Sequence, residues 1–478
     1  MFPFARRLLL TLLILPALLG LPAVASAGAQ TDGGTARLSD SRYLIVLDTS
    51  TTAAQARSLV TAAGGTVAAN YTRQMGVLVA ESTVSGFAAV LRASSLVDEV
   101  GADFSWKGLP GGGPEPSQDP LESEQWDMQQ IRTEQAHAVQ AGARAVDVGI
   151  LDSGTDGRHP DFMVDGQASN VDCARGRDFV LGNGPGVGNP DPCTDNQFHG
   201  THVSGTVGAQ ANGIGIVGVA PNVTLVPVKV CDTTGYCYAS SVVDGITYAG
   251  DAQLDVINMS FFVDDNEFQE STEFKCNSDP VQRAFRKAVE RAVQYARSQG
   301  VTPVAALGNS DTDLAHPEDD QGVTNECEVV PAETQGVIGV ASLGRNSEKA
   351  GYSNYGTGAT DITAPGGNGT TGDCRRTVLS TFPGGGYVCI QGTSMASPHA
   401  AGVAALIVSQ IGTLGADGDV KASPTKVEAL VQNTAIDIGL WGYDECFGNG
   451  RIDALRAVTA DTSRAADPLA PNCPEYNE

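Results

Sequence analysis

Three polar residues stand at the borders of apolar segments, where a folded chain could bring them together. Ser394 lies at the start of the small-residue run GTSMASPHAAGVAAL, which predicts a buried helix. His199 opens a second such run, HGTHVSGTVGA, and Asp152 ends the apolar run AVDVGILD. A serine nucleophile needs a base that takes its proton and an acid that orients this base. Ser394, His199 and Asp152 could therefore supply nucleophilic catalysis.

Attack on a carbonyl group also needs donors for the negative charge that develops on its oxygen. Asn309 follows the apolar run VTPVAAL, so its amide could act beside the backbone N–H of Ser394. Two milder interpretations stay open. Ser394 could be a helix N-cap, as many serines before helices are. His202, one helical turn after His199, competes for the role of the base.

Apolar strands and helices alternate through most of the chain and would position these residues. We expect strands at residues 145–152, 225–232, 254–262, 301–307 and 337–343, and helices at residues 201–210, 239–251 and 279–299. The strands are almost continuously apolar, as strands covered on both faces are. The pattern predicts an α/β domain with a largely parallel sheet. A carboxylate such as Asp152 at the carboxyl end of a central strand would line the usual crevice of such a sheet.

The chain before this domain divides into several segments. A charged start, an apolar stretch and the sequence Ala25-Ser26-Ala27 predict a signal peptide, with an uncleaved membrane anchor as the alternative. A strand-helix-strand-strand-helix-strand pattern then predicts a small ferredoxin-like α+β domain. The expected boundaries are signal peptide 1–27, flexible lead-in 28–41, small domain 42–106, Gly/Pro-rich linker 107–118, main domain 119–462 and C-terminal tail 463–478.

The composition excludes several classes of partner. The formal net charge of −26 argues against nucleic acid and anionic membranes. After the signal peptide we find no segment long and apolar enough to span a bilayer. We therefore expect an exported, extracellular protein with no membrane association in its mature form, and we expect a monomer.

The chain contains ten cysteines, and all of them follow residue 170. In an exported protein this even number predicts disulfides rather than a metal site. Ten cysteines allow 945 complete pairings, so the sequence alone does not fix the connectivity. Closeness along the chain suggests the pairs Cys231–Cys237, Cys173–Cys193, Cys374–Cys389 and Cys446–Cys473, which leaves Cys276–Cys327.

Five blocks in one order carry a family resemblance: DSGTDGRHPDF, HGTHVSGTVGA, INMS, GN and GTSMASPHAAG. They resemble the subtilisin-like serine proteases, or subtilases, over about residues 119–460. The resemblance implies a three-layer α/β fold with a mainly parallel seven-stranded sheet. It also implies hydrolysis of peptide bonds through an acyl-enzyme. The implied roles are acid for Asp152, base for His199, nucleophile for Ser394 and oxyanion donor for Asn309.

The same resemblance assigns the small domain and the groove. Residues 42–106 correspond to the propeptide of the family, an intramolecular inhibitor and folding chaperone whose removal activates the enzyme. The substrate groove would include Ser260, Phe261, Phe262 and Gly308. Phe261 and Phe262 depart from the small residues usual after INMS, which predicts a differently shaped groove.

The resemblance further implies a structural Ca²⁺ site. The loop after the His199 helix has the length of the family's strong calcium loop. It would supply the side chain of Asn212 and the backbone carbonyls of Gln210, Ile214 and Ile216. Asp119 and Asp161 would supply the carboxylate ligands. Such oxygen ligands suit a hard cation, although both carboxylates could instead be capping or solvated groups.

Two other functions stay open beside a self-activating serine endopeptidase. One is a catalytically silent binding protein on the same fold. The other is an esterase that uses the same acyl-enzyme chemistry.

Overall fold

The computed structural model describes residues 37–107, 121–164, 168–180, 191–263, 280–316, 328–416 and 418–473, which all belong to one compact unit. The predicted signal peptide, most of the predicted linker, Asp119 and the pair Cys276–Cys327 lie outside the described residues. The other four disulfides are confirmed: Cys173–Cys193, Cys231–Cys237, Cys374–Cys389 and Cys446–Cys473.

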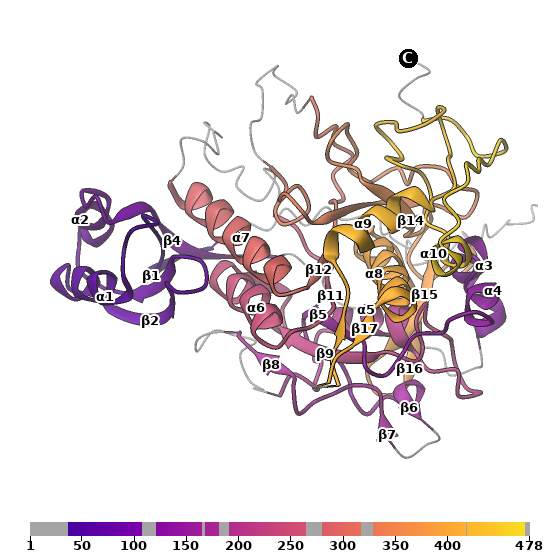
Figure 1. The fold of residues 1–478 in the computed structure, drawn as a ribbon, viewed down its shortest axis with the longest axis horizontal. Coiled ribbons are helices and arrows are strands. Elements are labelled where there is room, and N and C mark those ends of the chain that lie inside the picture. The colour runs from indigo at the N-terminus through magenta and orange to yellow at the C-terminus, as the bar shows by residue number, and fades with distance from the viewer. Residues whose placement is uncertain are drawn as a thin grey trace, which may run out of the picture. The chain divides into compact units, whose positions relative to one another are not determined.

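A parallel sheet of seven strands carries the main domain (Figure 1). Its order is β14-β13-β12-β11-β5-β9-β8, and all its neighbouring strands run parallel. The strands are β5 (Asp147–Asp152), β8 (Arg177–Asp178), β9 (Thr224–Lys229), β11 (Val256–Met259), β12 (Thr302–Ala306), β13 (Ile338–Leu343) and β14 (Ile362–Pro365). The predicted seven-stranded sheet is thereby confirmed.

Helices cover both faces of this sheet because successive strand residues point to opposite sides. Val148 and Ile150 of β5 pack with α5 (His199–Gly208) and α8 (Thr393–Ile411). Leu151 packs in the opposite cluster with α6 (Ala239–Asp251) and α7 (Pro280–Ser298). Figure 1 shows α6 and α7 side by side on that face. The result is the expected three-layer α/β arrangement.

Short elements complete the main domain. They are η1 (Glu122–Glu124), α3 (Trp126–Gln130), α4 (Thr133–His137), η2 (Pro160–Phe162), α9 (Pro424–Asn433) and α10 (Ala454–Thr459). Three small antiparallel pairs are β6 (Met163–Val164) with β7 (Ala168–Ser169), β15 (Val378–Phe382) with β16 (Gly386–Ile390), and β17 (Thr413–Leu414) with β18 (Val420–Lys421).

The N-terminal module, residues 37–107, has the predicted strand and helix order. Its elements are β1 (Arg37–Leu47), α1 (Ala53–Ala62), β2 (Thr66–Tyr71), β3 (Val77–Glu81), α2 (Phe87–Arg92) and β4 (Val97–Lys107). The strands are antiparallel in the order β4-β1-β3-β2. A capping box of Thr52 and Gln55 starts α1, because each side chain satisfies a backbone N–H that the helix leaves free.

The strands extend beyond two of the predicted boundaries. The lead-in does not extend to residue 41, since β1 begins at Arg37 and pairs with β4 on both sides of an irregularity after Leu38. The linker does not include Lys107, which still belongs to β4. The predicted tail also contacts the main domain before Cys473. Ala466 forms a β-bridge with Asp437, and the carboxylate of Asp467 lies 3.3 Å from the guanidinium of Arg451.

The module joins the main domain along an additional strand. β10 (Tyr236–Tyr238) pairs antiparallel with the end of β4 and extends the sheet of the module to five strands. Next to this edge, Asp103 accepts hydrogen bonds from the backbone N–H and the hydroxyl of Ser240, at 3.0 and 2.5 Å. Ser240 lies in the first turn of α6, so the carboxylate faces the positive end of the helix dipole.

A buried polar pair holds α3 against α8. The carboxylate of Asp127 lies 3.0 Å from Nε2 of His399, and neither residue is exposed. The other ring nitrogen of His399 lies 2.8 Å from the carbonyl oxygen of Met395, one turn earlier on α8. The pair thus fixes the buried ring of His399 and, with it, the first turns of the helix that begins at Thr393.

We expect the substitution Asp127→Ala to lower the free energy of unfolding by about 2–3 kcal/mol, because it leaves a buried ring nitrogen without its partner. Asp127→Asn should lose less, since the amide oxygen can still accept. Denaturant unfolding of both variants in a Ser394→Ala background, which prevents self-digestion, measures the difference. Equal stability of the Ala variant and its parent would contradict this assignment.

Candidate active site

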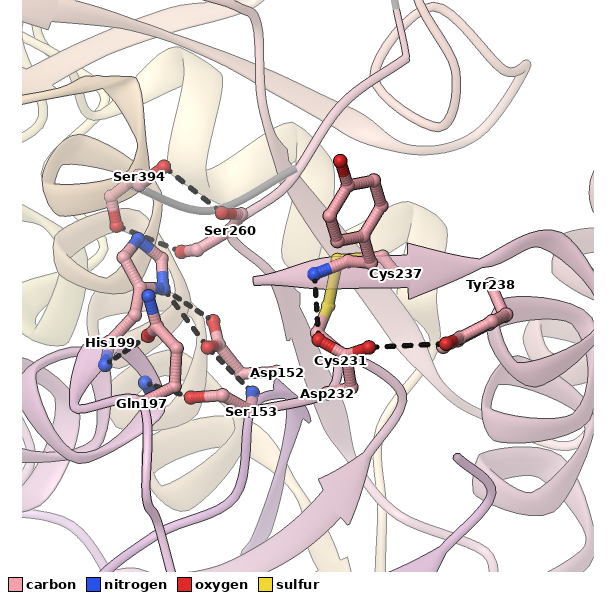
Figure 2. Close-up of a disulfide and its surroundings, with 12 residues drawn as sticks. Asp152, Ser153, Gln197, His199, Cys231, Asp232, Cys237, Tyr238, Ser260 and Ser394 are labelled. Carbon is pink, nitrogen blue, oxygen red and sulfur yellow. Dashed lines mark hydrogen bonds and ion pairs between the residues drawn. A yellow bond between two sulfur atoms is a disulfide. The ribbon is translucent and has the colours of Figure 1, made fainter. Parts of the chain in front are cut away.

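Asp152 and His199 form a buried pair at the carboxyl end of the sheet (Figure 2). Asp152 ends β5, His199 is the first residue of α5, and neither is exposed. Nδ1 of His199 lies 2.9 and 3.0 Å from the two carboxylate oxygens of Asp152. The carboxylate can therefore fix the tautomer with the proton on Nδ1, which leaves Nε2 free to accept a proton.

Further hydrogen bonds hold this pair in place. Ser153 donates its backbone N–H to the Asp152 carboxylate at 2.7 Å, and its hydroxyl accepts the N–H of Gly200 at 3.0 Å. The side-chain oxygen of Gln197 accepts the N–H of His199 at 2.8 Å. These bonds satisfy the first N–H groups of α5, which a helix start leaves without partners. These bonds thus fix the position of the His199 imidazole relative to β5.

Ser394 lies on the other side of the imidazole. Figure 2 shows the ring of His199 between Asp152 and Ser394. The Ser394 hydroxyl donates to the carbonyl oxygen of Ser260 at 3.0 Å, and the Ser260 hydroxyl donates to the carbonyl of Ser394 at 2.8 Å. Within the described residues, Nε2 of His199 is buried and has no hydrogen-bond partner. The Ser394 hydroxyl is thus bonded to Ser260 and not to His199.

The buried side-chain amide of Asn258 connects β11 with the first turns of α8. The side chain of Asn258 donates to the Ser260 hydroxyl at 2.8 Å and accepts from the Ser397 hydroxyl at 2.7 Å. Asn258 belongs to β11, so these bonds connect a central strand with the helix of Ser394. Because these side chains are buried, their hydrogen bonds are stronger than they would be in water, and breaking one of them is costly.

Asn309 is oriented by the residue before Ser394. Its side-chain oxygen accepts the backbone N–H and the hydroxyl of Thr393, at 2.9 and 2.8 Å. The amide nitrogen must then point away from Thr393. A Cβ atom placed on Gly392 would lie 3.6 Å from the backbone nitrogen of Ser394 and 3.7 Å from Nδ2 of Asn309. Both nitrogens therefore lie within 4 Å of one point beside Gly392, which is compatible with the two donors of an oxyanion hole.

The other histidines near this centre have structural partners. His202 lies with Nε2 3.2 and 3.3 Å from the carbonyl oxygens of Val388 and Val378. Burial lowers the pKa of His202 to about 3, so the ring stays neutral. His159 accepts the N–H of Asp161 and contacts the carbonyl of Gly386. Neither ring bonds to the carboxylate of Asp152, which favours His199 over His202 as the base.

The predicted groove residues lie beside Ser394 in different ways. Ser260 bonds to it directly, whereas the side chain of Phe261 is fully buried in the core on the side of α6 and α7. Gly308 has φ +114°, and a Cβ atom there would meet Nδ2 of Asn354 at 2.3 Å and Phe262 at 3.5 Å. Glycine is therefore required next to Asn309.

The predicted calcium ligands gather around Asp161. One of its carboxylate oxygens accepts the N–H of Ile216 at 2.9 Å, and the other is buried without a hydrogen-bond partner among the described residues. The side-chain oxygen of Asn212 accepts the N–H of Ile214, and the backbone carbonyl of Gln210 accepts the N–H of Asn212. Asp119 lies outside the described residues.

The environment of Asp161 fits a cation. Burial raises the pKa of its carboxyl group to about 7, although the N–H of Ile216 and the hydroxyl of Tyr387 favour the charged form. An orphaned buried carboxylate oxygen beside carbonyl and amide oxygens matches the ligands that Ca²⁺ prefers. A second acidic cluster, which the sequence did not predict, consists of Asp147, Asp255 and Asp419. Asp147 begins β5, whereas Asp152 ends it.

Asp195 is a positioning residue that the sequence analysis missed. One oxygen of its carboxylate accepts the Ser153 hydroxyl at 3.0 Å, and the other accepts the N–H and the hydroxyl of Thr201 at 2.9 and 2.7 Å. It thus connects the residue after Asp152 with the first turn of α5. An aspartate four residues before His199, where helix starts favour acidic side chains, was the available signal.

Comparison with known proteins agrees with this arrangement. The model of the subtilase family matches residues 143–450. The chain belongs to the subtilase family. Subtilisin DY of Bacillus licheniformis is 34% identical over 313 residues, which cover 66% of this chain and 90% of the relative. An alkaline protease of Alkalihalobacillus alcalophilus is 32% identical over 334 residues, or 70% of this chain and 69% of the relative.

A solved structure resembles a longer part of this subtilase. The epidermin leader peptide processing serine protease of Staphylococcus aureus matches with a TM-score of 0.67 and 23% identity, and covers 89% of this chain and 99% of its own. At that identity the likeness shows the fold alone. The relatives are serine proteases of the subtilisin type, and they support a proteolytic function for this chain. Among the described helices, none is both long and apolar enough to cross a membrane.

Proposed function

We propose that this subtilase is a secreted serine endopeptidase that activates itself by removing its N-terminal module. The single observation that carries the proposal is the buried pair of Asp152 and His199, whose unpartnered Nε2 lies on the side of Ser394, with Asn309 bonded to the neighbouring Thr393 (Figure 2). The predicted signal peptide and the four disulfides support secretion.

The chemistry follows from the positions of these side chains. The Ser394 hydroxyl gives its proton to Nε2 of His199 as its oxygen attacks the peptide carbonyl. Asp152 stabilises the imidazolium through Nδ1–H. The N–H of Ser394 and the amide of Asn309 bind the negative oxygen. His199 then donates the proton to the leaving amine, and water releases the acyl group in the same way.

The N-terminal module is suited to act as an inhibitor in cis. The end of β4 forms a strand pair with β10, and Trp106 in this pair is fully buried with its ring 6.2 Å from that of Phe261. Phe261 follows Ser260, the hydrogen-bond partner of Ser394. An extended chain on β10 thus packs on the residue that follows Ser260, and it would exclude a substrate from the same edge.

The alternatives receive less support. A silent binding protein would not need a buried Asp152–His199 pair with a serine hydroxyl on the side of its free ring nitrogen. An esterase would use the same three groups, but a strand edge such as β10 offers backbone pairing that a peptide can satisfy and a simple ester cannot.

A structural Ca²⁺ is proposed at Asp161. The carboxylate of Asp161, the side chain of Asn212 and the carbonyls of Gln210, Ile214 and Ile216 would hold it, together with Asp119. When bound, the ion would supply positive charge to a buried carboxylate and tie the loop after α5 to the segment before β6.

Self-activation predicts a difference in intact mass between the secreted wild type and its Ser394→Ala variant. The wild type should separate into the module and a catalytic chain, because the cut depends on the nucleophile. The variant should keep both in one chain. Labelling of the wild type by a serine-directed phosphonate serves as the control for an active site. Equal cleavage of both proteins would show that another protease performs the cut.

Association of the cleaved module should weaken as the pH rises. Asp244 of α6 faces Tyr71, Arg42 and Asp103 of the module, and burial raises its pKa to about 6 from its ordinary value of 3.8. Burial also raises the pKa of Asp103. The contribution of Asp244 is therefore fully present below about pH 4 and is lost as the pH rises through 6.

From pH 5 to pH 8 we expect the affinity for the module to fall, because the burial that favours the protonated form of Asp244 outweighs the opposite effects of Tyr71 and Arg42. Size-exclusion chromatography of the processed protein at both pH values measures how much module stays bound. The matched variant Asp244→Asn cannot ionise at this position and should lose most of the pH dependence. Tighter association at pH 8 than at pH 5 would refute this origin.

Removal of calcium should lower the melting temperature by roughly 5 °C, since an ion that binds only the folded state stabilises it by mass action. Differential scanning fluorimetry of the Ser394→Ala protein with and without a chelator provides the measurement. Asp161→Asn should melt lower in calcium and respond little to the chelator. An unchanged melting temperature after exhaustive chelation would remove the calcium proposal.

A further inference from the structure

A tight hairpin closed by a disulfide borders the active site. It comprises residues 231–238, which we call the Cys231–Cys237 hairpin. The two cysteines also form a backbone β-bridge, their Cα atoms lie 3.9 Å apart, and neither is exposed. The two cysteines are separated by 6 positions in the sequence, so the disulfide closes a short loop. Figure 2 shows this hairpin on the side of Asp152 away from His199.

The carboxylate of Asp232 accepts hydrogen bonds from other residues of the same hairpin. One oxygen of Asp232 accepts the N–H groups of Thr234 and Tyr236, at 2.8 and 3.0 Å, and the hydroxyl of Thr234 at 2.7 Å. The other oxygen accepts the Tyr238 hydroxyl at 3.1 Å. Asp232 itself is buried. The conformation of the turn is thus determined by both a covalent bond and a polar network.

The base of the hairpin is attached to Asp152. The backbone N–H groups of Val230 and Cys231 both donate to the carbonyl oxygen of Asp152, at 2.9 and 3.1 Å. Asp152 is the residue that orients His199. The first cysteine of the disulfide is therefore one hydrogen bond away from the acid of the candidate triad.

The end of β4 pairs with the outer edge of the hairpin. Its strand β10 pairs antiparallel with residues 105–107, and Cys237 stands opposite Trp106. The indole of Trp106 packs on Phe261, two residues beyond the end of β11. The second cysteine of the disulfide thus belongs to the strand that pairs with residues 105–107, while the backbone of the first donates to the carbonyl of Asp152.

We propose that the Cys231–Cys237 disulfide is a positioning element for extended peptides, which fixes the pairing edge β10 relative to Asp152 and Ser394. The inference rests on the proposed peptidase function. The cysteines touch no reacting atom in this scheme, and they act through the backbone of β10. A strand of only three residues has little pairing of its own to keep it in register, so the cross-link replaces the neighbours that a longer strand would have.

The test compares two substrates on one variant, Cys231→Ser/Cys237→Ser. A peptide with at least four residues before the scissile bond, including an aromatic one, reaches β10. An ester of a single acylated amino acid uses Ser394, His199 and Asp152 but ends before β10. We expect KM for the peptide to rise about tenfold with kcat changed less than twofold, and we expect the ester kinetics to stay unchanged.

A matched control removes a disulfide elsewhere. Cys446→Ser/Cys473→Ser breaks the link in the cluster around Phe447 and should leave both substrates unaffected. The variant Cys231→Ala/Cys237→Ala, which keeps apolar side chains at the two buried positions, is measured in parallel in case the serine variant does not fold. Failure of both variants to fold would assign the disulfide to folding and overturn the proposal.

The remaining outcomes separate this inference from the proposed function. A wild type that hydrolyses neither substrate, or only the ester, would overturn the peptidase function and this inference with it. A wild type active on both substrates, with a variant that keeps its KM for the peptide, would overturn this inference alone. An equal loss on peptide and ester would also overturn it, because the disulfide would then support the catalytic residues and not the peptide.

Discussion

The contact between Asp152 and His199 is the constraint on which the rest of the structure depends. A carboxylate and an imidazole that are both fully buried keep their positions only if every neighbouring donor and acceptor is satisfied. Ser153, Gln197 and Asp195 provide these partners from the strand end and the helix start. The parallel sheet has to deliver β5 and α5 to one edge for this network to close.

The same edge explains why the N-terminal module fits here. Its last strand adds to β10, and its Asp103 faces the start of α6 through Ser240. Each contact uses a group of the main domain that would otherwise lack a partner: an open strand edge or a free helix N–H. The cost is that the carboxylates of Asp103 and Asp244 are taken out of water.

Much of this arrangement could be predicted from the sequence because it depends on local patterns. Continuous apolar runs predicted five of the seven strands of the main sheet, and closeness along the chain predicted the four disulfides that the structure describes. The geometry around Ser394 could not be predicted, because the bonds to Ser260 and Asn258 join segments more than 130 residues apart. The boundary at Arg37 was missed since polar residues there are held by strand pairing, which has no sequence signature.

Trp106 gives the molecule an optical property of its own. The chain has three tryptophans: Trp106 lies in the core shared by the module and the main domain, Trp126 is buried in the main domain, and Trp441 is 65% exposed. Only the indole of Trp106 would move from an apolar core into water when the module departs, so intrinsic fluorescence should shift to longer wavelength. Chains with and without the module would thereby differ in emission wavelength, without any added label.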